Sequence, residues 1–119
     1  MSLILPHHEW PQTDRALWDC IFREGDLLDD QGPLAHLRPT SRETLANGYG
    51  RWLAWLRDAH PGALTDPPDT RVTRERLEAW LADLAHTAPM SQLSFVDRVL
   101  RVMQAGFPDQ NWSRHKQLQ

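Results

Sequence analysis

The longest regular pattern of apolar and polar positions runs from residue 38 to residue 56, RPTSRETLANGYGRWLAWL. On a helical wheel, five large apolar residues of this segment fall within about 100° of arc, the width of a stripe that faces a core. They are Leu45, Tyr49, Trp52, Leu53 and Leu56. The opposite side carries Thr44, Asn47 and Arg51. The pattern predicts a central helix with a broad buried face and a polar outer face.

The start of this helix is set by Pro39, whose ring removes an amide donor and restricts the residue before it. We therefore expect the helix to begin after Pro39, with Thr40 as its N-cap and Glu43 completing a T-x-x-E capping box. Gly48 and Gly50 lie inside the helix, at a cost of roughly 1 kcal/mol each relative to alanine. This cost indicates that another helix or a ligand backbone approaches closely at these two positions.

Three further segments have the apolar spacing and the end signals of helices. They are expected at residues 14–22 with Thr13 as the cap, at 74–86 with Thr73 as the cap, and at 91–105. Glycine and proline mark the turns between them, and no segment alternates with period two for long enough to form a strand. The sequence predicts an all-α bundle with three main helices and one or two short ones.

The last of these helices combines an apolar stripe with a polar face that is rich in arginine. The stripe consists of Leu93, Val96, Val99, Leu100 and Met103. The polar face carries Ser91, Ser94, Arg98 and Arg101, with Asp97 as the nearby acid. Both this helix and the central one have hydroxyl or amide residues near the start and arginine one or two turns later. That arrangement suits a helix whose N-terminal end approaches a phosphate backbone, and an ordinary solvated face is the alternative.

Length and cysteine content indicate a single cytoplasmic domain. A chain of 119 residues is long enough to bury one core, to which its six tryptophans contribute large side chains. The single cysteine, Cys20, excludes an intramolecular disulfide and fits a reducing compartment. No transmembrane run or signal peptide is evident. We expect an extended lead at 1–12, the helical domain at 13–113 and a tail at 114–119.

The net charge of −3 conceals an uneven distribution along the chain. Residues 1–30 contain seven acids and two arginines, a net charge of −5, whereas residues 31–119 contain eleven bases and nine acids, a net charge of +2. Twelve of the thirteen basic residues are arginine, which suits bidentate contacts to phosphate. A GC-rich coding bias would produce the same ratio. Nucleic-acid binding is therefore compatible with this chain in spite of its overall negative charge.

No constellation of residues indicates catalysis or a cofactor. The run His7-His8-Glu9 lacks the three or four converging ligands of a zinc site, and the remaining histidines are scattered, so no metal is expected. Cys20 has no partner thiol and no histidine in register. The chain also lacks the G-x-S-x-G, P-loop and G-x-G-x-x-G motifs. We predict neither an enzyme nor a small-molecule substrate.

Four segments, taken in order, resemble the core-binding domain of tyrosine recombinases, the phage integrase family. The opening helix of that domain is similar to T-S-R-E-T-L-A-N-G-Y-G-R-W-L-A-W-L. Its second core helix is similar to R-V-T-R-E-R-L-E-A-W-L-A-D-L, and the next helix to S-Q-L-S-F-V-D-R-V-L-R-V-M. The closing motif resembles P-D-Q-N-W-S. The likeness covers residues 13–113, and the order of the segments makes it more specific than any one of them.

The resemblance implies a small SAM-like orthogonal helical bundle that forms half of a C-shaped clamp around a recombination half-site. Double-stranded DNA is then the expected partner, and other recombinase protomers are further partners. The contacts would be made to the major groove and the adjacent phosphates by the two arginine-bearing helices. The residues that match these positions are Arg42, Thr44, Arg51, Ser91, Gln92, Ser94, Arg98 and Arg101.

The chain departs from the family after Trp112, where the catalytic domain with its nucleophilic tyrosine would follow. Tyr49, the only tyrosine, lies on the predicted buried stripe and is no substitute. The resemblance thus implies a module that binds DNA without cleaving it. The alternative is a helical protein–protein interaction module, or a truncated integrase remnant that no longer binds DNA. DNA binding requires the arginine faces to converge on one concave surface, with the acidic segment 14–30 turned away.

Overall fold

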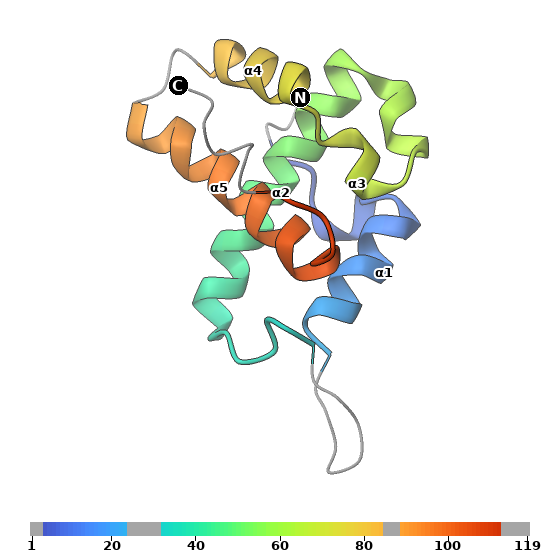
Figure 1. The fold of residues 1–119 in the computed structure, drawn as a ribbon, viewed down its shortest axis with the longest axis vertical. Helices are drawn as coiled ribbons and strands as arrows, with labels where there is room; N and C mark the ends of the chain where they lie inside the picture. The colour runs from blue at the N-terminus through green and yellow to red at the C-terminus, as the bar shows by residue number, and fades with distance from the viewer. Residues whose placement is uncertain (1–3, 24–31, 85–88, 113–119) are drawn as a thin grey trace.

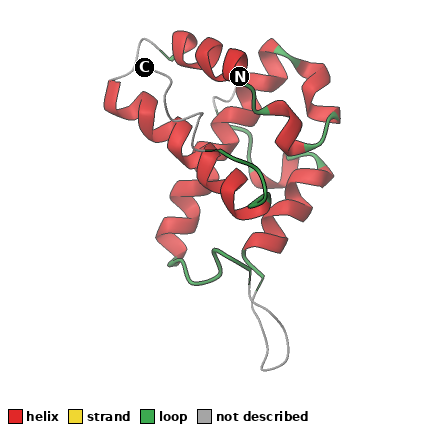
Figure 2. Ribbon diagram, in the orientation of Figure 1, coloured by secondary structure: helices red, strands yellow, loops and turns green. Residues whose placement is uncertain are grey.

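The structure, a computed structural model, describes residues 4–23, 32–84 and 89–112, and every regular element in these ranges is a helix (Figures 1 and 2). The elements are η1 (His7–Glu9), α1 (Gln12–Ile21), α2 (Pro39–Ala59), η2 (Pro61–Thr65), α3 (Pro68–Arg71), α4 (Arg74–Asp83) and α5 (Pro89–Gly106). The predicted all-α fold is confirmed. Among the described helices, none combines the length and apolar character needed to cross a bilayer.

The central helix of the fold is α2, and α5 crosses it with α1 to one side (Figure 1). All five residues of its predicted stripe are at most 3% exposed, so the helical spacing identified the buried face correctly. The buried face is wider than predicted, because Gly48, Gly50 and Ala54 are buried as well. A helix enclosed to this extent positions any side chain that projects from its remaining polar strip.

The predicted start of α2 is wrong, because the N-cap lies two residues earlier than expected. The helix begins at Pro39 with Arg38 as N-cap, and no side chain caps it. Proline at the first helical position lacks only an amide hydrogen that would have no intrahelical partner there, and its fixed φ suits the helix. Thr40 therefore lies inside the first turn, where its carbonyl oxygen accepts a hydrogen bond from the hydroxyl of Thr44 (3.0 Å). The expected capping box between Thr40 and Glu43 does not form.

Of the two other predicted caps, one is wrong and one is confirmed. The helix α1 begins at Gln12 with Pro11 as its N-cap, so Thr13 lies inside the first turn and does not cap it. Thr73 does cap α4, since its hydroxyl oxygen accepts a hydrogen bond from the backbone N–H of Arg76 (3.2 Å). The helix α4 then ends at Asp83, three residues before the predicted end.

The glycines inside α2 lie where two other segments approach it, as we inferred from their low helix propensity. A Cβ atom at Gly50 would lie 2.7 Å from the carbonyl oxygen of Leu5, and the N–H of Leu5 donates to the carbonyl of Gly50 (3.0 Å). A Cβ atom at Gly48 would lie 2.9 Å from the Cβ of Arg98 on α5. Both distances are too short for a real Cβ contact. The N-terminal segment is thus held to the middle of α2, in place of the extended lead that we expected.

The buried stripe of α5 agrees with the prediction except at its first turns. Val96, Val99, Leu100 and Met103 are buried, whereas Leu93 is 37% exposed, so its predicted inward position is wrong. The start of α5 lies at the edge of the molecule, while its second half passes in front of α2 and contacts α1 (Figure 1). An apolar stripe is buried only over the length that other helices cover.

Trp112 closes the C-terminal side of the core. It is 3% exposed, and its indole N–H donates to the carbonyl oxygen of Phe107 (3.0 Å). Trp52 and Trp80 form the centre of the aromatic core, with ring centroids 5.1 Å apart. The bundle therefore presents two long helices, α2 and α5, whose remaining polar faces meet at a common seam.

Candidate functional site

A groove of about 340 Å³ lies along this seam, between the first turns of α2 and the middle of α5. Its lining residues are Thr40, Ser41, Thr44, Leu45, Ser94, Asp97, Arg98 and Arg101. No side chain caps α2, so backbone N–H groups at the positive end of its dipole are open to an anionic ligand or to solvent. The polar faces that the sequence identified on two separate helices therefore converge on one concave surface.

Two of the predicted arginines belong to this groove. Arg101 is exposed, whereas Arg98 is half-buried and its aliphatic chain passes over Gly48. Neither guanidinium forms an ion pair with any acid of the described residues. Asp97 is the one carboxylate in the lining, so these side chains carry a net charge of +1. Positive charge without a close partner is what an anionic ligand would meet there.

Arg51 lies further along the same seam, outside the groove itself. Its guanidinium carbon is 4.6 Å from the ring centroid of Phe95, and that of Arg98 is 5.5 Å from the same centroid. Both distances are within the range of a cation–π contact. The seam thus carries three arginines, one from α2 and two from α5.

Arg42 is directed away from the seam and holds the segment that precedes α2. Its Nε donates to the carbonyl oxygen of Leu37 (3.0 Å), and its Nη2 donates to that of Ala35 (2.6 Å). The guanidinium carbon also lies 5.1 Å from the ring centroid of Phe22. A wheel drawn from one helix could not reveal this, because the carbonyl acceptors belong to the turn before the helix. Arg42 therefore has a structural role, which is to hold the turn that precedes α2.

The remaining predicted residues lie on α2 and α5 with unequal relations to the groove. The hydroxyls of Thr44 and Ser94 line it, and Thr44 keeps its oxygen as an acceptor while donating within α2. Gln92 is half-buried and is not part of the lining. The side chain of Ser91 lies outside the described part of the structure. The groove therefore unites four of the eight predicted residues: Thr44, Ser94, Arg98 and Arg101.

Sequence reasoning missed a buried ionic cluster that joins four elements. The carboxylate of Asp14 on α1 accepts hydrogen bonds from Nη1 of Arg71 (2.7 Å) and from the hydroxyl of Tyr49 (2.6 Å). Arg71 also donates to the backbone carbonyls of Ala63 (2.7 Å) and Leu64 (3.0 Å). Asp14, Tyr49 and Arg71 are each 0% exposed. Because these groups satisfy one another, the cluster is a structural centre.

No local pattern marks this cluster in the sequence. Asp14 and Arg71 are 57 residues apart, and each lies near a helix end, where a charged residue is ordinary. Asp14 lies in the first turn of α1, where a solvated carboxylate would also interact favourably with the helix dipole. Only the tertiary structure distinguishes the two roles.

The cluster predicts that the free energy of unfolding falls at alkaline pH. Burial raises the pKa of Tyr49 well above its ordinary value of 10.0, and the charge of Asp14 adds to this shift. Above about pH 10 the unfolded chain loses the phenol proton while the folded chain keeps it, so rising pH favours unfolding. We expect wild-type stability to fall by about 1.4 kcal/mol per pH unit more than that of Tyr49→Phe. Urea unfolding between about pH 9 and about pH 11 tests this, and parallel pH profiles for the two proteins would contradict it.

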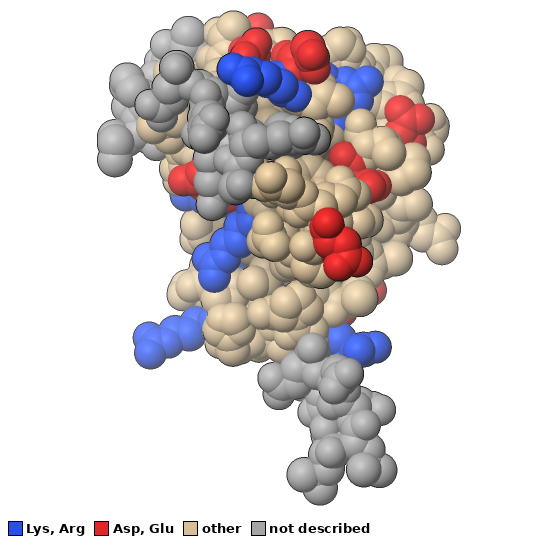
Figure 3. Space-filling view, viewed as in Figure 1, with Lys and Arg blue, Asp and Glu red and all other residues tan. Residues whose placement is uncertain are grey.

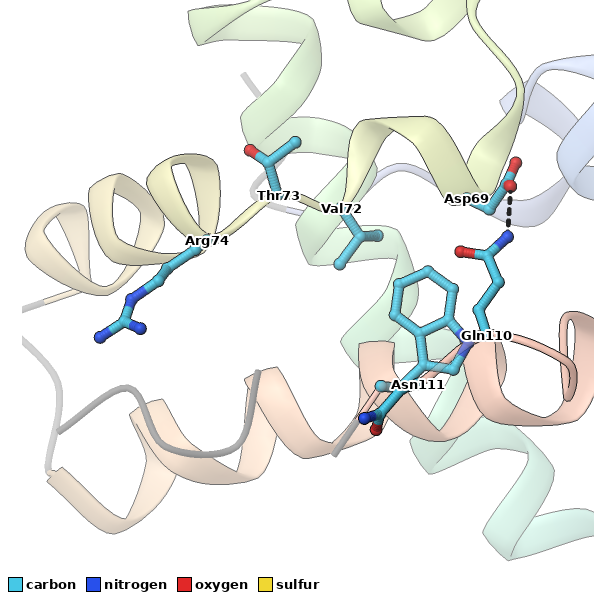
Figure 4. A pocket seen from close by; sticks show the side chains of 7 residues that line it. Asp69, Val72, Thr73, Arg74, Gln110 and Asn111 are labelled. Carbon is cyan, nitrogen blue, oxygen red and sulfur yellow. Dashed lines mark hydrogen bonds between the residues drawn. The ribbon is translucent and has the colours of Figure 1, made fainter. Parts of the chain in front are cut away.

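A second pocket, of about 450 Å³, lies between the α3–α4 connection and the C-terminal segment (Figure 4). Its charged groups already have partners. Asp69 accepts a hydrogen bond from the side-chain amide of Gln110 (2.7 Å), and Arg74 pairs with Glu78 (3.0 Å). At the top of Figure 3, over α4, acidic and basic side chains lie side by side. This surface therefore offers an anion less unpaired positive charge than the α2–α5 seam.

Nothing in the described residues indicates a metal centre, since no three of their His, Cys, Asp and Glu side chains are grouped to hold an ion. Comparisons of the chain with protein-family models, with curated proteins and with solved structures give no match. The α2–α5 seam and the resemblance of the helical segments are therefore the two grounds for assigning a function.

Proposed function

We propose that this chain is a double-stranded DNA-binding domain of the kind that precedes the catalytic domain in tyrosine recombinases, with the α2–α5 groove against the phosphate backbone. The observation that carries the proposal is the meeting of the uncapped N-terminus of α2 with Arg98 and Arg101. Helix dipole, hydroxyl groups and guanidiniums all favour an anion at the same place. The proposal assigns binding and no cleavage step.

The protein–protein interaction module has less support from the surface. Stable interfaces have a core enriched in aromatic and other apolar side chains. Among the described residues, Leu93 is the one large hydrophobic side chain that is exposed. The acidic segment bears on the choice as well: Asp14 is neutralised inside the core, Asp19 is exposed on α1, and residues 24–31 lie outside the described ranges. The unpaired charge of the seam thus favours nucleic acid over protein.

The salt dependence of DNA binding tests the proposal. With Arg42 held by backbone carbonyls, Arg51, Arg98 and Arg101 remain to neutralise about three phosphates. Counterion release then predicts a slope of log K against log salt of roughly −3, with a Kd of about 10⁻⁴ to 10⁻⁶ M at physiological salt. Replacing Arg98 and Arg101 together with alanine should reduce the steepness of the slope by about two units. Fluorescence anisotropy with a labelled duplex over a range of salt concentrations measures it.

The matched control removes two arginines that already have acidic partners. Arg57 pairs with Asp58 (3.1 Å) and Arg74 with Glu78 (3.0 Å). The double variant Arg57→Ala/Arg74→Ala has the same net charge as the groove variant but should keep the wild-type slope. Equal flattening in both variants would reject the groove as the contact surface. An NMR titration that shows no shifts at millimolar DNA, or shifts confined to α1, would favour the interaction module.

A further inference from the structure

We propose that Arg51 and Arg98, gathered on the ring of Phe95, form a two-point clamp for a diphosphate group or for neighbouring phosphates of one nucleic-acid strand. The clamp extends the α2–α5 groove, and its DNA form rests on the function proposed above. Its recognition of a free diphosphate does not depend on that function. It is defined by Arg51, Phe95 and Arg98, with Gly48 beneath it.

The central element of the clamp is the half-buried ring of Phe95. The guanidinium carbons of Arg51 and Arg98 lie 4.6 Å and 5.5 Å from its centroid. The two carbons are therefore at most 10.1 Å apart, the sum of these two distances. The clamp requires both groups to donate to one doubly charged anion from the same side of the ring, and the several donors that each guanidinium presents in a fixed fork suit this contact.

The ring of Phe95 packs against the core, so it can position the two guanidinium groups. Its centroid lies 6.5 Å from that of Trp80, a residue 1% exposed in the core. Contact with a core indole limits the movement of the ring, so each guanidinium is drawn toward a defined place. Arginine loses several rotatable bonds when it binds, and ordering it in advance reduces that cost.

Gly48 supplies the space through which Arg98 reaches the ring. A Cβ at this position would meet Cβ, Cγ and Cδ of Arg98, the three methylene carbons of its side chain. The glycine costs helix propensity in the middle of α2, and that cost is explained by the passage of this one side chain. Glycine at this position lowers the stability of α2 but leaves room for the side chain of Arg98 to lie across the helix.

Neither cation of the clamp is neutralised by a carboxylate of the described residues. Arg51 lines a small pocket that also includes Asp58 and Asp83. Asp58 pairs with Arg57 (3.1 Å), and Asp83 accepts a hydrogen bond from the indole of Trp55 (2.6 Å). Two like charges held on one ring repel each other, and a divalent anion between them would relieve that repulsion. This favours diphosphate over a neutral or cationic ligand.

Inorganic diphosphate is the probe that tests the clamp directly. The full chain is titrated at low salt and matched ionic strength, following the arginine Nε–Hε signals by NMR. We expect shifts at Arg51 and Arg98, and at least tenfold tighter binding of diphosphate than of inorganic phosphate, because only the former spans two guanidiniums. Equal binding of the two anions would overturn the two-point model.

Two variants separate the roles of the charges and the ring. Arg51→Gln/Arg98→Gln should weaken diphosphate binding at least tenfold, since it removes both charge-assisted contacts. Phe95→Leu keeps an apolar side chain and both charges, and should weaken binding about three- to tenfold through loss of arginine ordering. The controls are Arg57→Gln/Arg74→Gln for the charges and Phe107→Leu for a half-buried ring that has no cation–π contact with a described arginine. Both controls should bind as wild type does.

Parallel titrations with duplex DNA distinguish failure of the clamp from failure of the proposed function. If the duplex binds with the expected salt slope but Phe95→Leu and the double glutamine variant match their controls, the clamp is wrong and the DNA assignment stands. If diphosphate binds as expected but the duplex does not, the clamp stands and the DNA assignment is wrong. If neither ligand shifts the arginine signals, both are wrong. Should Phe95→Leu fail to fold, the glutamine variant alone decides.

Discussion

Replacing Asp14 with alanine is expected to lower the free energy of unfolding by about 3–5 kcal/mol. Arg71 would then remain in a fully buried site without a counter-ion, since its other acceptors are the neutral carbonyls of Ala63 and Leu64. A domain of this kind is stable by about 5–15 kcal/mol in total, so the variant would be close to unfolding at ambient temperature. Urea denaturation followed by tryptophan fluorescence measures the loss.

Two companion variants make this expectation specific. Asp19→Ala removes an exposed acid from the same helix and should change stability by no more than about 0.5 kcal/mol. Arg71→Met combined with Asp14→Leu replaces the ion pair with apolar groups, and should recover much of the loss because no charge is left buried. If Asp14→Ala costs no more than Asp19→Ala, the buried ion pair does not contribute as its geometry indicates.

The second large effect concerns Trp52, which is 0% exposed at the centre of the aromatic core. Truncation of a large buried aromatic residue to alanine usually costs about 3–5 kcal/mol. Its indole N–H has no hydrogen-bond partner among the described residues, and an unsatisfied buried donor costs about 1–3 kcal/mol. Removing that donor offsets part of the loss. We therefore expect Trp52→Ala to cost about 3 kcal/mol, the lower end of the range.

Trp55→Ala is the natural comparison, because the two indoles stack with centroids 5.6 Å apart. Trp55 is only half-buried, and its N–H donates to Asp83 on the exposed side. Its loss should be well below that of Trp52, about 1–2 kcal/mol. Chemical denaturation of both variants, at equal protein concentration, gives the comparison. Equal losses would mean that the buried face of α2 is wrongly assigned.

The parts of the fold that the sequence predicted are those that depend on residues close together in the sequence. The stripe of α2, the hydroxyl cap at Thr73 and the close approach at Gly48 all follow from local spacing or local cost. The predictions are wrong where two local signals competed for one helix start, or where packing by other helices determined whether a side chain is buried. Proline at a first helical position outweighed the Thr40 capping box, and the edge position of Leu93 left it exposed.

The candidate site shows the same division. Periodicity found the polar faces of α2 and α5, including Arg98 and Arg101, because each face is a property of one helix. It could not separate Arg42, whose donors are taken by carbonyls of the preceding turn, from Arg51, which lies on Phe95. These two arginines differ in their neighbours, and neighbours from other elements are not visible in a helical wheel.

The bond between Asp14 and Arg71 also predicts when α1 docks during folding. It closes a loop of 57 residues, and loop closure costs chain entropy before the buried contacts can compensate for it. During synthesis, Asp14 leaves the ribosome before Arg71, so its carboxylate has no ionic partner until α3 is made. We therefore expect α1 to dock late, so that a nascent chain that stops before residue 71 should keep that helix accessible to proteases. We expect pulse proteolysis of stalled chains to show that α1 becomes protected once Arg71 has emerged from the ribosome.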